Sequence, residues 1–405
     1  MIARTLIKPS FYQDSVALMG VARELRGGAG IQEAAALMGT PANRELMEQA
    51  GLLTAEAAAA GPNDLVIVVR ADSEAAAAAA LARTTGDLSR IVFVNTGSEA
   101  VHLACRIARE ATGRPLIAKF AAGYDGWYDE VALGNAGSAE AAMTANRRPA
   151  SLRTLLLRYN DPGDAESLFA EHDNIAAVLI EPVLANAGCI LPAPGYLEHL
   201  QAVARRHGAL VILDEVLMGY RLHAGLTGHR LGLDPDLATV GKAIGSGIAV
   251  AAVAGKAAPM SLLEDGRVAR AGTYAGNPLA CAAVLATLER LAALDYAALD
   301  RSGAGLRHGI AAAFARVGVA VSTVGYGSVF GLWFAATPPA NYREALSKAR
   351  PDLSLRLHLA LRRRGALVMP SPFGRLYLSA AHDAAAMDEL TAAFVDAAAA
   401  WPSGG

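Results

Sequence analysis

Seven short apolar runs mark the middle of the chain. They occupy residues 91–95, 116–120, 152–157, 176–181, 209–214, 237–240 and 250–254. Most are separated by amphipathic or alanine-rich segments of helical length. Continuous apolar strands that alternate with helices are typical of a parallel sheet covered by helices on both faces. The pattern therefore predicts an α/β fold with a mainly parallel, seven-stranded sheet in a large domain.

A smaller α/β pattern precedes this sheet and another follows it. The first predicts strands at 5–7, 34–38 and 64–70 and helices at 12–25, 42–50 and 73–83. Beyond a long helix predicted at 278–293, the chain mixes helices with short strands at 329–334 and 376–379. We expect three domains: a small α/β domain at 1–84, the large domain at 85–299 and a smaller α/β C-terminal domain at 300–405.

Composition narrows the function classes. The 405 residues are 53% hydrophobic and 18% charged, with a formal net charge of -2, which gives no support for a nucleic-acid or membrane partner. No apolar run is long enough to cross a bilayer. Cys105, Cys189 and Cys281 have no metal-ligand spacing. We expect a soluble, cytoplasmic protein without a metal site.

Two polar stretches directly follow predicted strands, where ligands bind in α/β sheets. In residues 95–100, Gly97 and Ser98 open a helix whose free N–H groups could hold a phosphate, or the stretch is an ordinary capped turn. In residues 212–216, Asp214 could pair with a protonated ring nitrogen of a cofactor, or it could be a metal ligand or a salt-bridged strand end.

Lys242 follows the next strand. A lysine buried among Gly, Ala, Val and Ile side chains should have a lowered pKa and become nucleophilic, although most lysines lie at the surface. Two glycine-containing loops add candidates. The loop at 123–128 could stack Tyr124 on a planar ring or simply pack, and the loop at 272–278 could be only the capped entry to a helix.

From about Leu88 onward the chain resembles the class III, fold-type I pyridoxal-phosphate (PLP) aminotransferases, and especially the glutamate-1-semialdehyde 2,1-aminomutases. The resemblance is carried by six stretches in family order: Phe93-Val-Asn-Thr-Gly-Ser-Glu-Ala100, Tyr124-Asp-Gly-Trp127, Ile180-Glu-Pro-Val-Leu-Ala-Asn186, Leu213-Asp-Glu-Val-Leu-Met-Gly-Tyr-Arg221, Thr239-Val-Gly-Lys-Ala-Ile-Gly-Ser-Gly247 and Gly272-Thr-Tyr-Ala-Gly-Asn-Pro278.

The resemblance implies a role for each matching residue. Lys242 would be the Schiff-base lysine and Asp214 would keep the pyridine nitrogen protonated. The other cofactor-binding residues would be Gly97 and Ser98 at the phosphate, Tyr124 and Val216 on the ring, Asn186 near the phenolic oxygen, Glu181 in the surrounding network, and Thr273 at the phosphate of a neighbouring subunit. The family also implies a homodimer that acts on a small amino donor and acceptor.

The chain departs from the family at its start. The usual N-terminal segment, which supplies substrate-facing residues, is replaced by residues 1–84. The stretches 8–16, 38–46 and 62–67 resemble the N-terminal domain of FdrA-like proteins, which are related to acyl-CoA synthetases. The chain is thus interpreted as a fusion near residues 84–90, whose first domain could recruit a protein partner.

Smaller departures concern the substrate. Asp125 stands where relatives have histidine, and Gly374 where aminomutases have glutamate. Arg375 is either a ligand for a substrate carboxylate or a solvated surface arginine. The expected function is amino-group transfer or 2,1-migration on a small amino acid or amino ketone. Racemisation and decarboxylation would use the same Lys242 and Asp214, and a catalytically impaired PLP-binding or scaffold protein is the alternative of another class.

Overall fold

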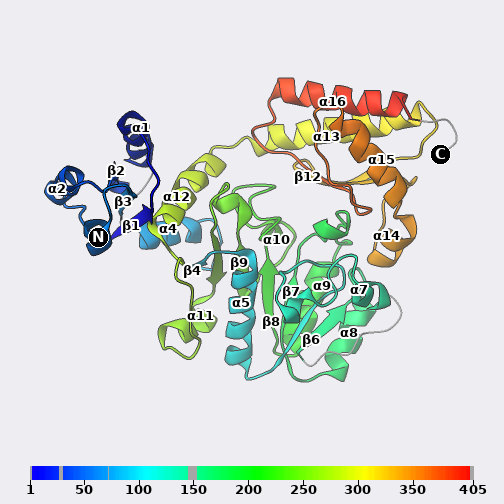
Figure 1. Ribbon diagram of the computed structural model, residues 1–405. Helices are drawn as coiled ribbons and strands as arrows, with labels where there is room; N and C mark the ends of the chain where they lie inside the picture. The colour runs from blue at the N-terminus through cyan, green and yellow to red at the C-terminus, as the bar shows by residue number, and fades with distance from the viewer. Residues whose placement is uncertain (1, 27–30, 72, 145–152, 402–405) are drawn as a thin grey trace.

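The computed structural model describes residues 2–26, 31–71, 73–144 and 153–401. It contains a small N-terminal sheet at one side, a large central domain, and a C-terminal unit above it in the view of Figure 1. None of the helices within these ranges combines the length and the apolar character needed to cross a bilayer.

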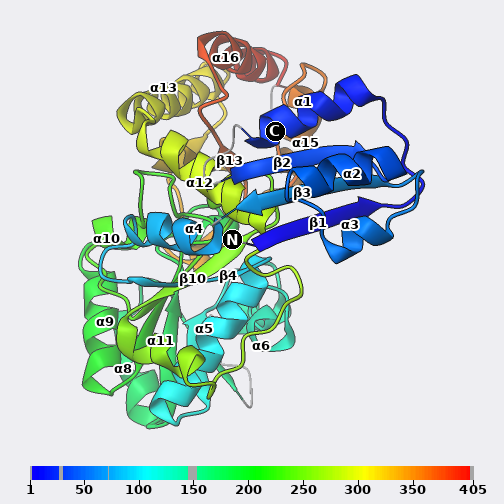
Figure 2. The same cartoon turned by 90° about the vertical axis from the view of Figure 1, so that its left-hand side faces the viewer.

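The N-terminal unit is a three-stranded antiparallel sheet in the order β1-β3-β2, seen face-on in Figure 2. Its elements are β1 (Ile2–Lys8), α1 (Ser15–Arg26), β2 (Ile31–Met38), α2 (Pro41–Gln49), α3 (Ala55–Ala59) and β3 (Leu65–Ala71). Thr40 and Thr54 cap α2 and α3 through their side-chain oxygens. Val66 and Val68 of β3 form a small core with Met47 of α2.

The next helix, α4 (Ser73–Ala82), packs on the large domain. Ala77, Ala80 and Leu81 lie in the same hydrophobic cluster as Phe93. The structure therefore places α4 in the core of the large domain, although the sequence grouped it with the first unit. The predicted boundary at residue 84 stays a prediction.

The large sheet has seven strands in the order β4-β10-β9-β8-β7-β5-β6. They are β4 (Arg90–Val94), β5 (Leu116–Phe120), β6 (Thr154–Leu157), β7 (Ile175–Ile180), β8 (Leu210–Asp214), β9 (Leu237–Val240) and β10 (Ala251–Gly255). Only β10 runs antiparallel to its neighbours. The prediction of a mainly parallel, seven-stranded sheet is confirmed, and the carboxyl ends of the other six strands meet at one edge.

Helices cover both faces of this sheet because alternate strand residues point in opposite directions. Ile212 packs in the layer of α5 (Gly97–Thr112), whereas Val211 and Leu213 pack in the opposite layer. The remaining helices of the domain are α6 (Asp129–Ala132), α7 (Ala139–Thr144), α8 (Pro162–Glu171), α9 (Tyr196–Arg206), α10 (Thr227–Arg230), α11 (Ala257–Glu264) and α12 (Pro278–Ala292).

The C-terminal unit packs helices on an antiparallel sheet of three strands in the order β11-β12-β13. Its elements are α13 (Tyr296–Ala315), β11 (Ser322–Tyr326), β12 (Val329–Trp333), α14 (Tyr342–Lys348), α15 (Pro351–Arg362), β13 (Arg375–Tyr377) and α16 (Ala384–Ala399). Trp333 donates a hydrogen bond to the Gly188 carbonyl at 3.0 Å and so joins this unit to the large domain.

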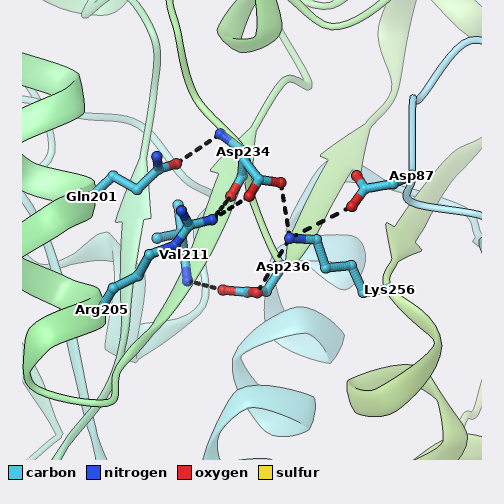
Figure 3. A network of polar contacts seen from close by, with 7 residues as sticks. All are labelled: Asp87, Gln201, Arg205, Val211, Asp234, Asp236 and Lys256. Atoms are coloured by element: carbon cyan, nitrogen blue, oxygen red, sulfur yellow. Dashed lines mark hydrogen bonds and ion pairs between the residues drawn. The ribbon is translucent and has the colours of Figure 1, made fainter.

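An ion-pair network fixes the opposite, amino-terminal edge of the large sheet (Figure 3). Lys256, which follows β10, lies with its Nζ 2.8 Å from Asp234 Oδ1, 3.8 Å from Asp236 Oδ1 and 3.6 Å from Asp87 Oδ2. Asp236 also accepts a hydrogen bond from the Val211 N–H at 2.9 Å. Because Asp87 belongs to the segment between α4 and β4, the network anchors the junction to the sheet.

Candidate active site

Lys242 lies where β9 turns into the 3₁₀ helix η2 (Lys242–Ile244). Its φ of +41° is in the left-handed region, a strain of roughly 1–3 kcal/mol that occurs most often at functional sites. The expectation of a buried side chain is wrong, because Lys242 is exposed and lines two cavities. Desolvation still lowers the pKa of Lys242, while Asp214 and Glu181 oppose the shift.

Asp214 ends β8 and is 4% exposed. Its Oδ1 accepts hydrogen bonds from the Val216 N–H and the Thr239 hydroxyl, each at 3.0 Å. No described residue donates to Oδ2 or forms an ion pair with this carboxylate, and no described group of three or more metal-binding side chains exists. Burial, and then the charge of Asp125, raise the pKa of Asp214 to about 7.

The neighbouring Glu215 has a different task. Its Oε1 accepts a hydrogen bond from the Gly228 N–H at 2.6 Å, and burial raises the pKa of Glu215 to about 8. Asp214 and Glu215 therefore have different roles: Glu215 holds the turn that follows β8, and Asp214 keeps one carboxylate oxygen free for a ligand.

The start of α5 has the features of an anion site. Thr96 is the N-cap and accepts from the Glu99 N–H at 3.2 Å, while Glu99 accepts from the Asn95 N–H at 2.7 Å. These bonds resemble a capping box and leave the N–H groups of Gly97 and Ser98 with no acceptor among the described residues. Two free N–H groups at a helix start suit a phosphate.

Val216 brings these parts together. A Cβ atom on Gly97 would lie 2.7 Å from Val216 Cγ1, and one on Gly241 would lie 3.4 Å from the same atom. The Val216 side chain therefore sits between the start of α5 and the residue before Lys242. The candidate phosphate site at the start of α5 and the candidate amine of Lys242 therefore lie on two sides of the Val216 side chain.

The aromatic loop approaches from β5. The Tyr124 N–H donates to Glu181 Oε1 at 2.6 Å, and Tyr124 is 44% exposed. A Cβ on Gly126 would lie 2.9 Å from Ser98 Oγ, so the loop also reaches the start of α5. Burial, then the charges of Asp125 and Asp214, raise the pKa of Glu181 well above its ordinary value.

Asp125 and Lys119 form a buried ion pair beneath this loop. Lys119 is fully buried in β5, and its Nζ lies 2.9 Å from Asp125 Oδ2. Lys119 also donates to the Val131 carbonyl at 2.6 Å and to Asn135 Oδ1 at 3.1 Å. Sequence reasoning named Asp125 but missed Lys119, although a lysine inside a strand buried on both faces is a signal for a partnered charge.

Three of the expected cofactor residues line one cavity of about 530 Å³: Tyr124, Asn186 and Lys242. The same cavity is lined by residues that the sequence did not single out, among them Arg221 and Tyr377. Arg375 is partly buried and also lines it. Thr273 lies elsewhere: it is exposed on a loop whose Gly272 approaches Asn95.

These side chains fit a phosphorylated pyridine aldehyde. An amine at Lys242 can bond covalently to an aldehyde, and Oδ2 of Asp214 can accept from a ring N–H. The Tyr124 ring can stack on a planar ring, and the free N–H groups of Gly97 and Ser98 can bind its phosphate. Each group has a counterpart in the cofactor that the sequence motifs implied.

Two family models match the chain. The class-III aminotransferase model matches residues 55–349, and the model of the AllF heavy metal-associated domain matches residues 1–99. The likeness of the N-terminal unit to FdrA-like proteins is therefore corrected, because the family that matches there is the AllF domain.

Curated relatives and solved structures agree with the larger match. Glutamate-1-semialdehyde 2,1-aminomutase of Sorangium cellulosum is 40% identical over 314 residues, covering 76% of this chain and 71% of the relative. An omega-transaminase from Sphaerobacter thermophilus superposes with a TM-score of 0.73 at 30% identity, over 88% of this chain and 83% of that one. A transaminase with PLP bound superposes with a TM-score of 0.71 at 26% identity, over 80% and 77%.

Proposed function

The chain belongs to the class-III aminotransferases, and on that premise we propose that it transfers or migrates the amino group of a small amino acid or amino ketone through Lys242. The observation that supports this most strongly is the placement of Val216 between Gly97 and Gly241, because it brings the start of α5 close to the residue before Lys242. The Val216 N–H also donates to Asp214 Oδ1, which ties Asp214 to the same turn.

The cofactor is PLP, which when bound draws electrons from the bonds at the substrate Cα. On this proposal, Asp214 Oδ2 would accept the hydrogen bond of the ring nitrogen, while the Val216 N–H and the Thr239 hydroxyl keep the carboxylate oriented through Oδ1. Tyr124 would cover one ring face, and the N–H groups of Gly97 and Ser98 would hold the phosphate, while Asn186 lies at the cavity wall.

Lys242 has two tasks in the proposed reaction. Its amine would anchor the cofactor, and its Nζ, once freed, would carry the proton from the substrate Cα to the cofactor C4′ carbon. The lowered pKa of Lys242 increases the fraction of neutral amine at neutral pH, which both tasks need. Glu181 orients the ring-stacking loop through the Tyr124 N–H.

We also propose that the active form is a homodimer. Thr273 is exposed and lies outside the cavity that Lys242 lines, which suits a residue that reaches the phosphate of a second copy. Sedimentation of the PLP-loaded chain tests this, and a monomer that turns over substrate at full rate would contradict it.

The function is tested by coenzyme uptake and by single half-reactions. The purified chain should acquire the visible absorption band of bound PLP, and individual amino donors should convert it to the pyridoxamine form. Lys242→Ala should abolish both changes, whereas the exposed Lys8→Ala should preserve them. Uptake of PLP without response to any donor would instead favour the impaired, PLP-binding alternative. Retention of the amine in the product would identify an aminomutase.

A further inference from the structure

A hollow lined by arginines lies on the large domain, away from the candidate active site. Its volume is about 490 Å³, and none of its described lining residues lines either cavity beside Lys242. The carboxylates that line it among the described residues are Glu110 and Glu130, whereas the lining arginines are Arg106, Arg109, Arg114, Arg153 and Arg267. Because the whole chain has a formal net charge of -2, this excess of positive charge is local.

The fold brings these arginines together from separate segments. Arg106 and Arg109 lie on α5, Arg114 precedes β5, Arg153 directly precedes β6, and Arg267 follows α11. The helix dipole favours a cation near the C-terminus of a helix, which accounts for Arg109 in the last turn of α5. The arginines of the other three segments do not belong to this helix, so their placement around the hollow needs another explanation.

Two of the arginines are held by backbone carbonyls instead of carboxylates. Arg114 Nη1 donates to the His207 carbonyl at 2.6 Å and to the Ile175 carbonyl at 3.2 Å. Arg106 Nη1 donates to the Ala269 carbonyl at 3.3 Å. Neither arginine forms an ion pair with a carboxylate in the described part of the chain. A carbonyl orients a guanidinium group without cancelling its charge, so both arginines can still bind an anion.

Glu130 is shared by two further arginines of the hollow. Its Oε2 lies 2.7 Å from Arg109 Nη1, and its Oε1 lies 3.1 Å from Arg153 Nη1. Arg267 pairs at 3.1 Å with Asp265, which does not line the hollow. The carboxylates nearby therefore offset only part of the positive charge, and an anion in the hollow would offset more of it.

His102 responds to the positive potential of the hollow. It lines the hollow from α5, and its ring stacks on Tyr128 with the ring centres 4.8 Å apart. Desolvation, and then the charge of Arg106, lower the pKa of His102, whereas Glu130 opposes the shift. An anion bound among the arginines would raise this pKa, because it would stabilise the protonated ring.

We propose that the hollow is a binding site for a diphosphate group, which Arg106, Arg114 and Arg267 contact. The planar fork of a guanidinium matches the oxygens of a phosphate, and several forks around one hollow suit a ligand with more than one negative charge. The ligand is either free diphosphate or the diphosphate of a nucleotide. The site is separate from the proposed function, because it shares no described residue with the cavities that Lys242 lines.

Calorimetric titration of the PLP-loaded chain with pyrophosphate tests the proposal. Loading fills the candidate phosphate site at the start of α5, so the added anion does not bind there. Arg106→Gln and Arg114→Gln should each raise the dissociation constant roughly tenfold, the loss expected for one charge-assisted contact. Glu110→Gln should lower it, because this change removes a negative charge from the lining. Arg363→Gln, an exposed arginine outside the hollow, is the matched control and should change nothing.

A second measurement follows His102 by nuclear magnetic resonance with isotope-labelled histidine. Pyrophosphate should raise the pKa of His102 in the wild type and raise it less in Arg106→Gln. His102→Gln identifies the signal among the nine histidines of the chain. Arg114 is partly buried, so Arg114→Gln could lose binding through a disturbed fold. Arg106 is exposed, and its replacement should leave the melting temperature unchanged, so the comparison does not depend on Arg114.

Titrations with ADP and AMP identify the ligand. ADP that binds no more tightly than pyrophosphate would show that the diphosphate alone is recognised, and tighter binding of ADP would assign the site to a nucleotide. AMP, which has one phosphate, should bind more weakly than ADP. The proposal is overturned if the wild type does not bind pyrophosphate, or if Arg106→Gln and Glu110→Gln bind it as the wild type does. A chain that takes up no PLP can be titrated unloaded with the same variants, so failure of the proposed function leaves this test intact.

Discussion

At the residue scale, the site contains buried carboxylates whose pKa values are raised. Burial, and then the charge of Asp125, raise the pKa values of Glu181 and Asp214, while Asp125 itself forms an ion pair with the buried Lys119. Such carboxylates are costly to ionise in the absence of a ligand. A protonated ring nitrogen at Asp214 would relieve this cost, so the cofactor and the folded chain should stabilise each other.

Asp214→Asn tests this cost in the cofactor-free chain. The pKa of Asp214 is about 7 in the folded protein. It should be about 3.9 in the unfolded chain, so between these values the folded state binds more protons. The free energy of unfolding should therefore fall as the pH rises from about 4 to about 7, by up to about 1.4 kcal/mol per pH unit. Asn at this position removes that contribution and can still accept from Val216 and Thr239.

Urea unfolding at pH 5 and pH 8 measures the difference. Glu181 and Glu215 titrate in both proteins, so the change in pH dependence between them isolates Asp214. The Asn variant should lose less stability between the two pH values than the wild type. If the free energy of unfolding changed equally with pH in both proteins, ionisation of Asp214 would carry no cost in stability.

At the scale of elements, one close contact positions α5 against the turn after β8. Gly97 has no room for a side chain because Val216 fills the space above it. On its other side the same valine lies beside Gly241, where a Cβ atom would be 3.4 Å from Val216 Cγ1, an ordinary contact. The geometry of the phosphate candidate relative to Lys242 therefore depends on a valine that itself carries no reactive group.

Gly97→Ala should disturb this contact in a way that can be reversed. Its Cβ would lie 2.7 Å from Val216 Cγ1, and such overpacking typically costs about 1–3 kcal/mol. The variant should melt at a lower temperature and bind PLP more weakly. Adding Val216→Ala removes the clashing carbon and should restore much of both properties, with Val216→Ala alone as the control. A double variant no better than Gly97→Ala would contradict the contact.

At the scale of the whole molecule, two ion pairs hold α4 and the segment after it, which follow the N-terminal unit, to the rest of the large domain. Glu74 of α4 pairs with Arg270 at 2.9 Å, close to the loop of Thr273, and Asp87 joins the Lys256 network. The first connection lies near the candidate phosphate loop and the second at the far edge of the sheet. The segment from α4 to β4 is thus tied to the large domain near each of the two edges of the seven-stranded sheet.

Lys256→Met tests the second connection. It leaves Asp87, Asp234 and Asp236 without their shared cation, so we expect a loss of about 1 kcal/mol in the free energy of unfolding. The loss should shrink at high salt, because screening weakens the ion pairs of the wild type. Urea unfolding at two salt concentrations measures it. Lys348→Met, which breaks a single pair with Glu344, is the control and should cost less; equal losses would argue against a network effect.

The sequence alone was sufficient for the large sheet and for the residue types of its active edge. Seven apolar runs predicted the seven strands to within two residues at either end, because a strand buried on both faces must be continuously apolar. It was less informative for β11, whose Ser-Thr-Val-Gly-Tyr sequence is half-buried and has no apolar run. It also did not reveal the placement of α4, since an alanine-rich helix has no distinct apolar face to indicate its partner.

Only the tertiary structure decided which polar groups share the site. Lys242 proved exposed to a cavity, and Arg221 and Arg375 lie more than a hundred residues apart in sequence yet line that cavity with it. Lys119 and Asp125 became a buried pair for the same reason. Apolar periodicity in the sequence indicates which face of an element is buried. The free-energy cost of burying a charged side chain depends instead on the groups that face it, and the packing of segments distant in sequence decides which groups those are.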